Sequence, residues 1–207
     1  MNYRVWMLLW LFWLPGWAAA SQCTLLIVGD SLSSGYGLAA GQSWVDLLDA
    51  RLKKVAPRWR VVNASVSGDT TQNGLQRLAP ALERQHPHGV LISLGGNDAL
   101  RGTSPRVIRQ NLQGLIRQAK ASGAWVALLE APVLPNYGKA YASAVAKLYG
   151  EVARAEKITH VPCFVCEVGV VPGMMQADGI HPNEKAQSAM LDAVWPHIKN
   201  QLRCPRK

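Results

Sequence analysis

The sequence contains no low-complexity linker, no internal repeat and no second long apolar run beyond its amino-terminal region. Without linkers or repeats, residues 21–207 are expected to form a single domain, and they are numerous enough to bury a sizeable core. Without a second apolar run, no stable membrane span is expected.

Acidic residues are also scarce. The chain has 13 Asp and Glu against 22 Lys and Arg, which gives a formal net charge of +9. A basic surface can attract nucleic acid or anionic membranes. Here the basic side chains are spread over several predicted elements, so nucleic-acid binding is not expected. A solvated basic surface is the simplest interpretation, and attraction to anionic lipid or other envelope surfaces stays open.

The first 20 residues carry the long apolar stretch of the chain. Arg4 precedes an apolar run over residues 5–17, and three alanines follow at residues 18–20. A basic start, a short apolar core and an Ala-x-Ala site are typical of a cleaved signal peptide. Residues 1–20 are therefore interpreted as a signal peptide, and the mature protein is expected to be periplasmic or secreted. Cys23 could mark a lipoprotein, but Gln22 stands where lipid attachment needs a small residue.

Cysteines are few: Cys23, Cys163, Cys166 and Cys204. An even number in an exported chain favours disulfides, and four cysteines allow three pairings. Cys163 and Cys166 could instead form a redox or zinc pair. Such a pair usually opens a helix after a strand, whereas residues 167–172 read as a loop. Structural disulfides or buried thiols are therefore expected, without a defined pairing.

The segment around Ser31 organises the rest of the chain. An apolar run over residues 24–28 has the length of a buried strand and ends abruptly in Gly29-Asp30-Ser31. Ser31 would then stand at the carboxyl end of a strand, where open α/β sheets bind ligands. Ser31 is therefore a candidate nucleophile, although Asp and Ser are also the residues of ordinary helix caps.

Strand-like and helix-like segments alternate after Ser31. Strands are expected at residues 60–64, 90–94, 125–130 and 159–164, and helices at residues 43–55, 70–83, 105–122, 140–155 and 183–198. This alternation predicts a three-layer α/β/α domain with a central parallel sheet of about five strands.

Polar loops recur where the carboxyl edge of that sheet is expected, at residues 63–70, 95–102 and 178–182. Asp178 precedes His181 by three residues across a turn at Gly179, so its carboxylate can bond Nδ1 and leave Nε2 for Ser31. We therefore expect a nucleophile, a base and a residue that orients the base: Ser31, His181 and Asp178.

The other two loops supply candidate oxyanion donors. Gly68 has no side chain, so its N–H can approach a ligand closely. Asn97 offers a side-chain amide, and an oxyanion donor of this kind is worth about 3–4 kcal/mol. Together with the N–H of Ser31, these groups are the predicted oxyanion hole.

Each motif also has an ordinary structural explanation. Asp-x-x-His is commonly a turn, and Gly-Gly-Asn-Asp is a good loop before a helix. Among the other histidines only His86 has an acid three residues earlier, and it is expected at the opposite edge of the sheet. His88, His160 and His197 lack that spacing, so all four are expected to be surface or packing residues.

Together the four blocks resemble the SGNH, or GDSL-type, hydrolase family. The four residues that name the family fall on Ser31, Gly68, Asn97 and His181 in the family's order, and the resemblance runs from Leu25 to the last helix. It implies a flavodoxin-like fold and hydrolysis of carboxylic esters and thioesters of medium to long acyl chains. No metal or other cofactor is expected.

An acyl substrate needs an apolar groove, for which two loops are candidate walls. One contains Leu134 and Tyr137, and the other spans residues 170–175. The expected substrate is a small acyl ester or thioester, with lysophospholipids or other envelope lipids favoured by export. The alternatives are an acetylesterase of O-acetylated glycans and a non-catalytic binding module. A monomer is expected.

Overall fold

The computed structural model describes residues 22–134 and 137–205. The predicted signal peptide lies outside these residues. Five parallel strands form one sheet in the order β2-β1-β3-β4-β5. Their bounds are β1 Cys23–Gly29, β2 Trp59–Asn63, β3 Gly89–Ser93, β4 Trp125–Leu129 and β5 Thr159–Val161.

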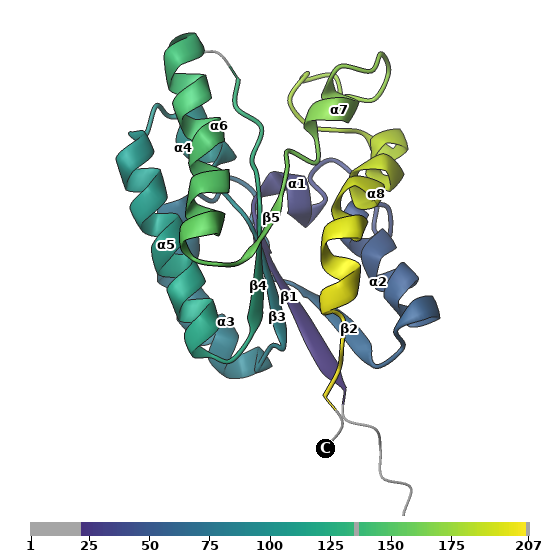
Figure 1. Cartoon of the computed structure of the whole chain (residues 1–207). Coiled ribbons are helices and arrows are strands. Elements are labelled where there is room, and N and C mark those ends of the chain that lie inside the picture. Colours follow the sequence, from purple (N-terminus) through teal and green to yellow (C-terminus); the bar gives the residue numbers. More distant parts are fainter. Residues whose placement is uncertain (1–21, 135–136, 206–207) are drawn as a thin grey trace, which may run out of the picture.

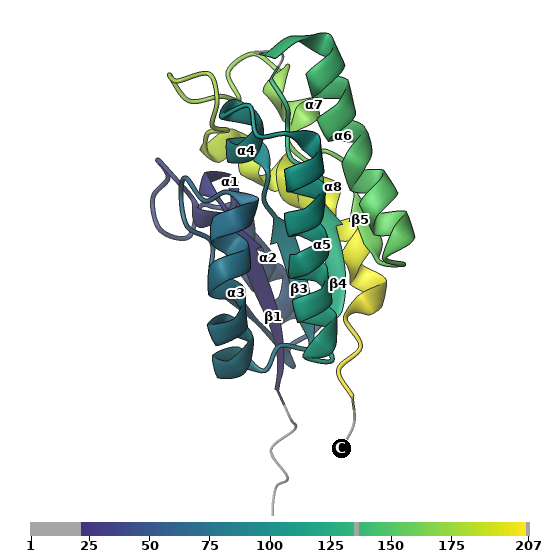
Figure 2. The same ribbon diagram turned by 90° about the vertical axis from the view of Figure 1, so that its left-hand side faces the viewer.

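Long helices cover both faces of the sheet, as Figures 1 and 2 show. One face carries α3 (Thr71–Gln85), α5 (Pro105–Ala121) and α6 (Gly138–Ala155), and the other carries α2 (Trp44–Val55) and α8 (Gln187–Ile198). Short helices lie at the ends of strands or helices: α1 Ser31–Ser34, α4 Gly96–Leu100, α7 Cys166–Gly169, η2 Glu184–Ala186 and η3 Lys199–Gln201. This confirms the predicted three-layer α/β/α class with five parallel strands.

The near-continuous apolarity of β1 follows from its position inside the sheet, between β2 and β3. Leu26 and Val28 pack into the core beneath α3 and α5, whereas Leu25 and Ile27 pack into the core beneath α2 and α8. Successive side chains of a strand point to opposite faces, so a strand covered on both sides is apolar at nearly every position. None of these four side chains is more than 1% exposed.

Side-chain caps start two of the long helices where the sequence places them. Ser43 accepts from the N–H of Asp46, whose carboxylate accepts from the N–H of Ser43, and Thr70 and Asn73 form the same reciprocal pair. Such capping boxes satisfy backbone donors that have no partner inside the helix. They fix the ends of α2 and α3 beside the carboxyl edge of the sheet.

Some local expectations differ from the structure. The fifth strand ends at Val161 instead of residue 164, and residues 166–169 form the one-turn helix α7 instead of a loop. The Cys163–Cys166 pair therefore does lead into a helix after a strand, which removes the sequence argument against a redox pair. Among the three pairings left open, the structure has Cys23–Cys204 and Cys163–Cys166.

The strand order places a switch point beside Ser31. From β1 the chain moves to β2 on one side and then returns to β3 on the other side. The connections leave the sheet in opposite directions there, which opens a crevice at the carboxyl ends of β1 and β3. No helix in residues 22–134 or 137–205 is long and apolar enough to cross a bilayer.

Candidate active site

Ser31 begins α1 immediately after the carboxyl end of β1. Asp30 caps this helix by accepting from the N–H of Leu32 at 3.1 Å. A Cβ at Gly29 would lie 2.8 Å from the Cβ of Ser33, so only glycine allows the strand to turn this sharply into the helix. The Gly29-Asp30-Ser31 segment is thus both a helix cap and a device that presents Ser31 at the sheet edge.

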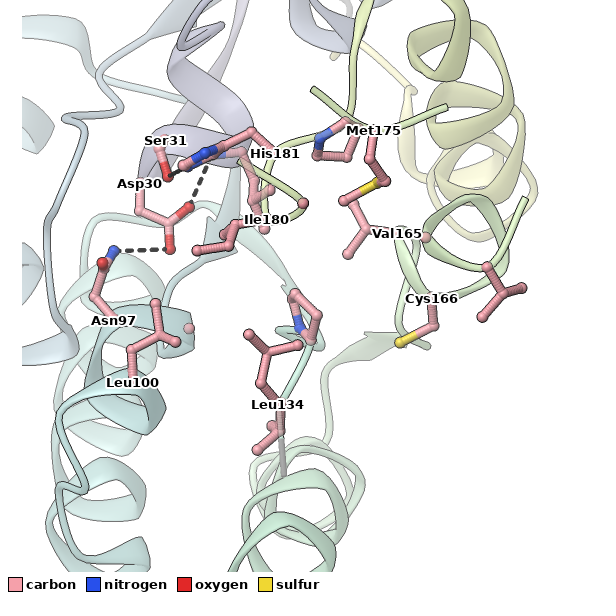
Figure 3. Close-up of a pocket in the computed structure, with 18 residues that line it drawn as sticks. Asp30, Ser31, Asn97, Leu100, Leu134, Val165, Cys166, Met175, Ile180 and His181 are labelled. Carbon is pink, nitrogen blue, oxygen red and sulfur yellow. Dashed lines mark hydrogen bonds between the residues drawn. The ribbon is translucent and has the colours of Figure 1, made fainter. Parts of the chain in front are cut away.

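Ser31, His181 and Asp178 form one hydrogen-bonded chain. The Oγ of Ser31 lies 2.9 Å from Nε2 of His181, and Nδ1 of His181 lies 2.7 Å from Oδ2 of Asp178 (Figure 3 shows the Ser31–His181 pair). The other carboxylate oxygen of Asp178 accepts from the N–H groups of Ile180 and His181 at 2.9 and 3.0 Å. The turn at Gly179 has φ +66°. The carboxylate therefore folds back onto the imidazole, as its spacing predicts.

The charge of Asp178 determines the tautomer of His181. Hydrogen bonds from the N–H of His181, from its imidazole and from the N–H of Ile180 lower the pKa of Asp178 to about 2. An ionised carboxylate only accepts hydrogen bonds. Nδ1 must therefore carry the proton, and in the neutral imidazole Nε2 is left to accept from the Ser31 hydroxyl.

Tyr36 and Gln176 hold His181 from outside this chain. The Tyr36 ring packs against the imidazole with a centroid separation of 4.6 Å, and the N–H of Gln176 donates to the carbonyl of His181 at 2.8 Å. Gln176 also donates through Nε2 to the carbonyl of Tyr36 at 2.9 Å. The position of the imidazole is therefore set by packing as well as by Asp178.

The predicted oxyanion donors lie on adjoining segments. The loop of Gly68, where φ is +84°, is tied to α1 by a 2.8 Å contact between the hydroxyls of Ser34 and Ser67. Asn97 lies in α4 and donates through Nδ2 to the carbonyl of Asp69 at 3.0 Å. Within the described ranges the N–H groups of Ser31 and Gly68 donate to no acceptor. These two donors are therefore available to a ligand.

A buried carboxylate that the sequence interpretation did not single out lies next to these groups. Asp30 is 3% exposed, and its Oδ2 lies 3.5 Å from Nδ2 of Asn97 (Figure 3). Burial raises the pKa of Asp30 to about 6, although the Leu32 N–H and the charge of His181 oppose that shift. The sequence shows Asp30 as a helix cap but contains no signal for its burial.

Replacing Asp30 with asparagine is expected to change how stability depends on pH. The folded-state pKa of about 6 lies above the ordinary value of 3.8. The stabilisation from the bound proton is therefore complete below about pH 4 and is lost as pH rises through 6. Over this pH range the unaltered protein should lose about 3 kcal/mol of unfolding free energy, and Asp30→Asn should not show this loss. Denaturant unfolding at pH 4, 5, 6 and 7 measures the difference between the two proteins.

The control for this measurement is Asp192→Asn, which changes an exposed aspartate on α8. The difference in unfolding free energy between Asp30→Asn and the unaltered protein should rise from pH 4 to pH 7. The same difference for Asp192→Asn should stay constant over this range. Parallel pH curves for the unaltered protein and Asp30→Asn would refute the role of Asp30.

An apolar cavity of about 430 Å³ opens beside Ser31. Polar groups of Asp30, Ser31, Asn97 and His181 lie on one side of it, and Val165, Cys166 and Met175 lie on the opposite side (Figure 3). Leu100, Leu134 and Ile180 also line it. The volume falls within the range of about 300–1,000 Å³ that is usual for small-molecule sites. The cavity can hold an apolar chain with its reactive end at Ser31.

Of the residues that mark the two predicted walls, Leu134, Val170 and Met175 line the cavity and Tyr137 does not. Leu134 lines the cavity, as do Val170 and Met175 at the two ends of the second wall. Tyr137 does not line it: its hydroxyl donates to the carbonyl of Leu100 at 3.5 Å, and its ring packs against Tyr141. Tyr137 therefore supports a lining residue instead of facing the substrate space.

Sequence reasoning missed several lining residues, including Leu100, Val165 and Ile180. Leu100 and Ile180 stand within three residues of Asn97 and Asp178, so proximity to a motif was the available signal. Val165 had no such signal, because it lies between the strand expected at residues 159–164 and the loop expected at residues 167–172, away from the catalytic motifs.

The remaining histidines lie outside the site. His86 ends α3 before β3, at the opposite edge of the sheet, as predicted. His88 accepts from the N–H of Thr24, and His160 contacts Glu130 at 3.2 Å. In the part of the chain that the structure describes, no three His, Cys, Asp or Glu side chains gather as a metal site would require. The absence of a cofactor stays a prediction.

Comparison with known proteins points to the same family as the sequence motifs. The GDSL-like Lipase/Acylhydrolase family matches residues 27–189. Esterase TesA of Pseudomonas aeruginosa is 51% identical over 184 residues, covering 89% of this chain and 91% of that protein. Thioesterase 1/protease 1/lysophospholipase L1 of Escherichia coli is 44% identical over 175 residues, covering 84% and 82%.

A solved structure extends the comparison to three dimensions. The crystal structure of TesA superposes with a TM-score of 0.83 at 50% identity, covering 87% of this chain and 99% of that chain. The resemblance carried by the four sequence blocks is therefore confirmed. The chain belongs to the GDSL-like lipase/acylhydrolase family of ester hydrolases.

Proposed function

We propose that the mature chain hydrolyses carboxylic esters and thioesters of medium to long acyl chains, with lipids such as lysophospholipids as substrates. The 2.9 Å contact between Ser31 Oγ and His181 Nε2, at the polar side of an apolar cavity of about 430 Å³, is the observation that carries this proposal. The names of its relatives (esterase, thioesterase and lysophospholipase) support the same reaction class.

The reaction begins with attack on the acyl carbonyl. Ser31 Oγ adds to the carbonyl carbon while its proton moves to Nε2 of His181. Negative charge develops on the carbonyl oxygen, and the N–H groups of Ser31 and Gly68 stabilise it together with the Asn97 amide. Recruiting that amide requires only that the oxyanion replace its 3.5 Å contact with Asp30, which is long for a hydrogen bond.

Collapse of the tetrahedral intermediate completes the acylation half of the reaction. The bond to the alcohol or thiol breaks, the leaving group takes the proton from Nε2, and the acyl group remains on Ser31. Water then gives a proton to Nε2 and adds to the acyl carbon, and the proton returns to Ser31 as the acid leaves. Asp178 keeps Nδ1 protonated throughout and stabilises the charged imidazole.

Asp178→Asn is expected to fold and bind substrate but to lower kcat by about 10⁴-fold, as the equivalent change does in other triads. The amide can donate to Nδ1 and so favour the imidazole tautomer that presents a proton to Ser31. Steady-state kinetics on a soluble ester separates kcat from KM. An unchanged kcat would show that Asp178 does not orient the base.

Export through the predicted signal peptide favours lipids as the physiological substrates. Acyl-CoA is an intracellular metabolite, whereas lysophospholipids and other esters occur in the envelope. A periplasmic or secreted location is therefore part of this proposal, as is a monomeric state.

A substrate panel tests the proposal. It contains p-nitrophenyl esters from acetyl to palmitoyl, a lysophospholipid, an acyl-CoA and an acetylated sugar. We expect kcat/KM to rise from acetyl toward longer chains, because a longer chain buries more apolar surface in the cavity. We also expect lysophospholipid turnover. Activity confined to acetyl groups would instead identify an acetylesterase of O-acetylated glycans.

A further inference from the structure

Exposed apolar side chains are concentrated at one edge of this molecule. Nine large apolar side chains are exposed among the described residues, and eight of them lie on segments at the carboxyl edge of the sheet. The exception, Val55, ends α2 at the opposite edge. Scattered exposed apolar residues are ordinary, but a patch on one face marks an interaction surface.

Six of these side chains surround the cavity, and together we call them the apolar rim: Leu100, Leu134, Tyr137, Val170, Val171 and Ile180. Four of the six line the cavity itself. Val170 is 82% exposed, so most of its side chain packs against nothing in this fold. The remaining two exposed residues of this edge, Tyr36 and Val66, follow α1 and β2.

The rim has two crests, one on each side of the cavity. One crest comprises α4, the segment after β4 and the start of α6, and the other comprises α7 and the segment after it, which lie apart at the top of Figure 1. Apolar side chains on both crests therefore face outward around the opening that leads to Ser31.

Charge near the rim is unevenly distributed. Three exposed cations lie on or beside the first crest: Arg101 directly follows α4, Arg106 lies in the first turn of α5, and Lys139 lies in the first turn of α6. None of them has an ion-pair partner within residues 22–134 and 137–205. The one acid of α4, Asp98, is buried and accepts from Thr71. Glu167 lies on the opposite crest, in α7. The first crest is therefore basic as well as apolar.

We propose that the apolar rim docks on an anionic phospholipid bilayer, with its valine, leucine and tyrosine side chains in the acyl–headgroup boundary and the three cations against lipid phosphates. Apolar burial and attraction of basic residues to anionic lipid together determine interfacial binding. The formal net charge of +9 acts in the same direction. The inference rests on the proposed function, because docking places the cavity opening where a lipid could enter it directly.

Charge complementarity favours a bilayer over a second copy of the chain. In a symmetric dimer joined through the rim, Arg101, Arg106 and Lys139 would face either their own equivalents or the opposite crest. On that crest α7 offers the single acid Glu167 to three cations, so most of them would lose water without gaining an anion. An anionic bilayer supplies a counter-charge to each of them.

The test compares two double variants with the same charge change. Val171→Asp/Lys139→Glu alters the rim at residues that do not line the cavity, and Val55→Asp/Lys54→Glu alters an exposed pair at the opposite edge. Binding is measured by vesicle sedimentation in a Ser31→Ala background, so that no lipid is consumed. The vesicles are phosphatidylcholine alone or an equal mixture of phosphatidylcholine and phosphatidylglycerol.

We expect binding to the mixed vesicles, weakening as salt is added, and at least about tenfold weaker binding for the rim variant. The opposite-edge variant should bind within about twofold of the parent, since its altered residues would face away from the bilayer. Both variants with Ser31 restored should hydrolyse p-nitrophenyl acetate normally, which shows that they fold. Should charge reversal harm folding, Val171→Ser/Lys139→Gln and Val55→Ser/Lys54→Gln form the milder pair.

Three results would overturn the proposal: no binding to the mixed vesicles, equal losses in the two variants, or a dimer that dissociates in the rim variant. Turnover of monomeric lysophospholipid without vesicle binding would remove the docking surface and leave the proposed function intact. Vesicle binding without turnover of any ester would leave the docking surface intact and remove the proposed function.

Discussion

Ser31→Ala is expected to lower kcat on carboxylic esters by about 10⁶-fold, the loss seen when a catalytic serine is removed from other triads. The loss is this large because the acyl-enzyme can form only on Ser31 Oγ, which lies 2.9 Å from His181 Nε2. The folded state should be retained, since alanine suits the first position of α1 and the Asp30 cap does not involve the serine hydroxyl. Kinetics and thermal unfolding measure the two effects.

Two histidine variants provide a matched control. His181→Ala should inactivate the enzyme to a similar degree, because the two residues act as a unit. His86 has the same spacing from an acid, Glu83, but lies at the opposite edge of the sheet with φ +40°. His86→Asn, which tolerates that conformation, should retain full activity. Retained activity in Ser31→Ala, or failure of a fluorophosphonate probe to label Ser31, would refute the mechanism.

Removing the Cys23–Cys204 disulfide is expected to produce the largest loss of stability. The bond joins the start of β1 to the segment after η3 across a sequence separation of 181. Closing a loop of that length restricts the unfolded chain, and the chain-entropy estimate is about 5 kcal/mol. That is a large fraction of the roughly 5–15 kcal/mol that stabilises a typical domain. Denaturant unfolding of Cys23→Ala/Cys204→Ala measures it.

The second disulfide is the internal control. Cys163 and Cys166 are only three residues apart, so the same estimate gives under about 2 kcal/mol for Cys163→Ala/Cys166→Ala. Because Cys166 lines the cavity, this variant should change acyl-chain preference more than it changes stability. Equal losses of stability in the two variants would show that loop length does not govern the contribution of either bond.

The sequence by itself was sufficient for the fold class and for the main chemical groups. Helix and strand periodicities are local properties, and capping residues such as Ser43 and Thr70 mark helix starts within a few positions. The hydrogen bond between Asp178 and His181 is also local, because it spans three residues across one turn. The predicted proximity of Ser31 and His181 rests on one non-local rule: the carboxyl ends of parallel strands lie at the same edge of the sheet.

The cavity wall was decided only by tertiary structure. Leu100 follows β3, whereas Val165 and Ile180 follow β5, and they come together because the strand order is β2-β1-β3-β4-β5. No periodicity within one segment reports which loop faces which. For the same reason Tyr137, which shares a loop with Leu134, could not be distinguished from a lining residue until its contact with Leu100 was known.

Burial of polar groups and disulfide pairing were likewise tertiary outcomes. Asp30 reads as a helix cap, yet its pKa of about 6 arises from the layers that enclose it. The Cys23–Cys204 bond depends on where two ends of the folded chain meet, with a Cα–Cα distance of 5.8 Å. Four cysteines in a sequence carry no information about that distance, because it is fixed by packing of β1 and α8 in the same core.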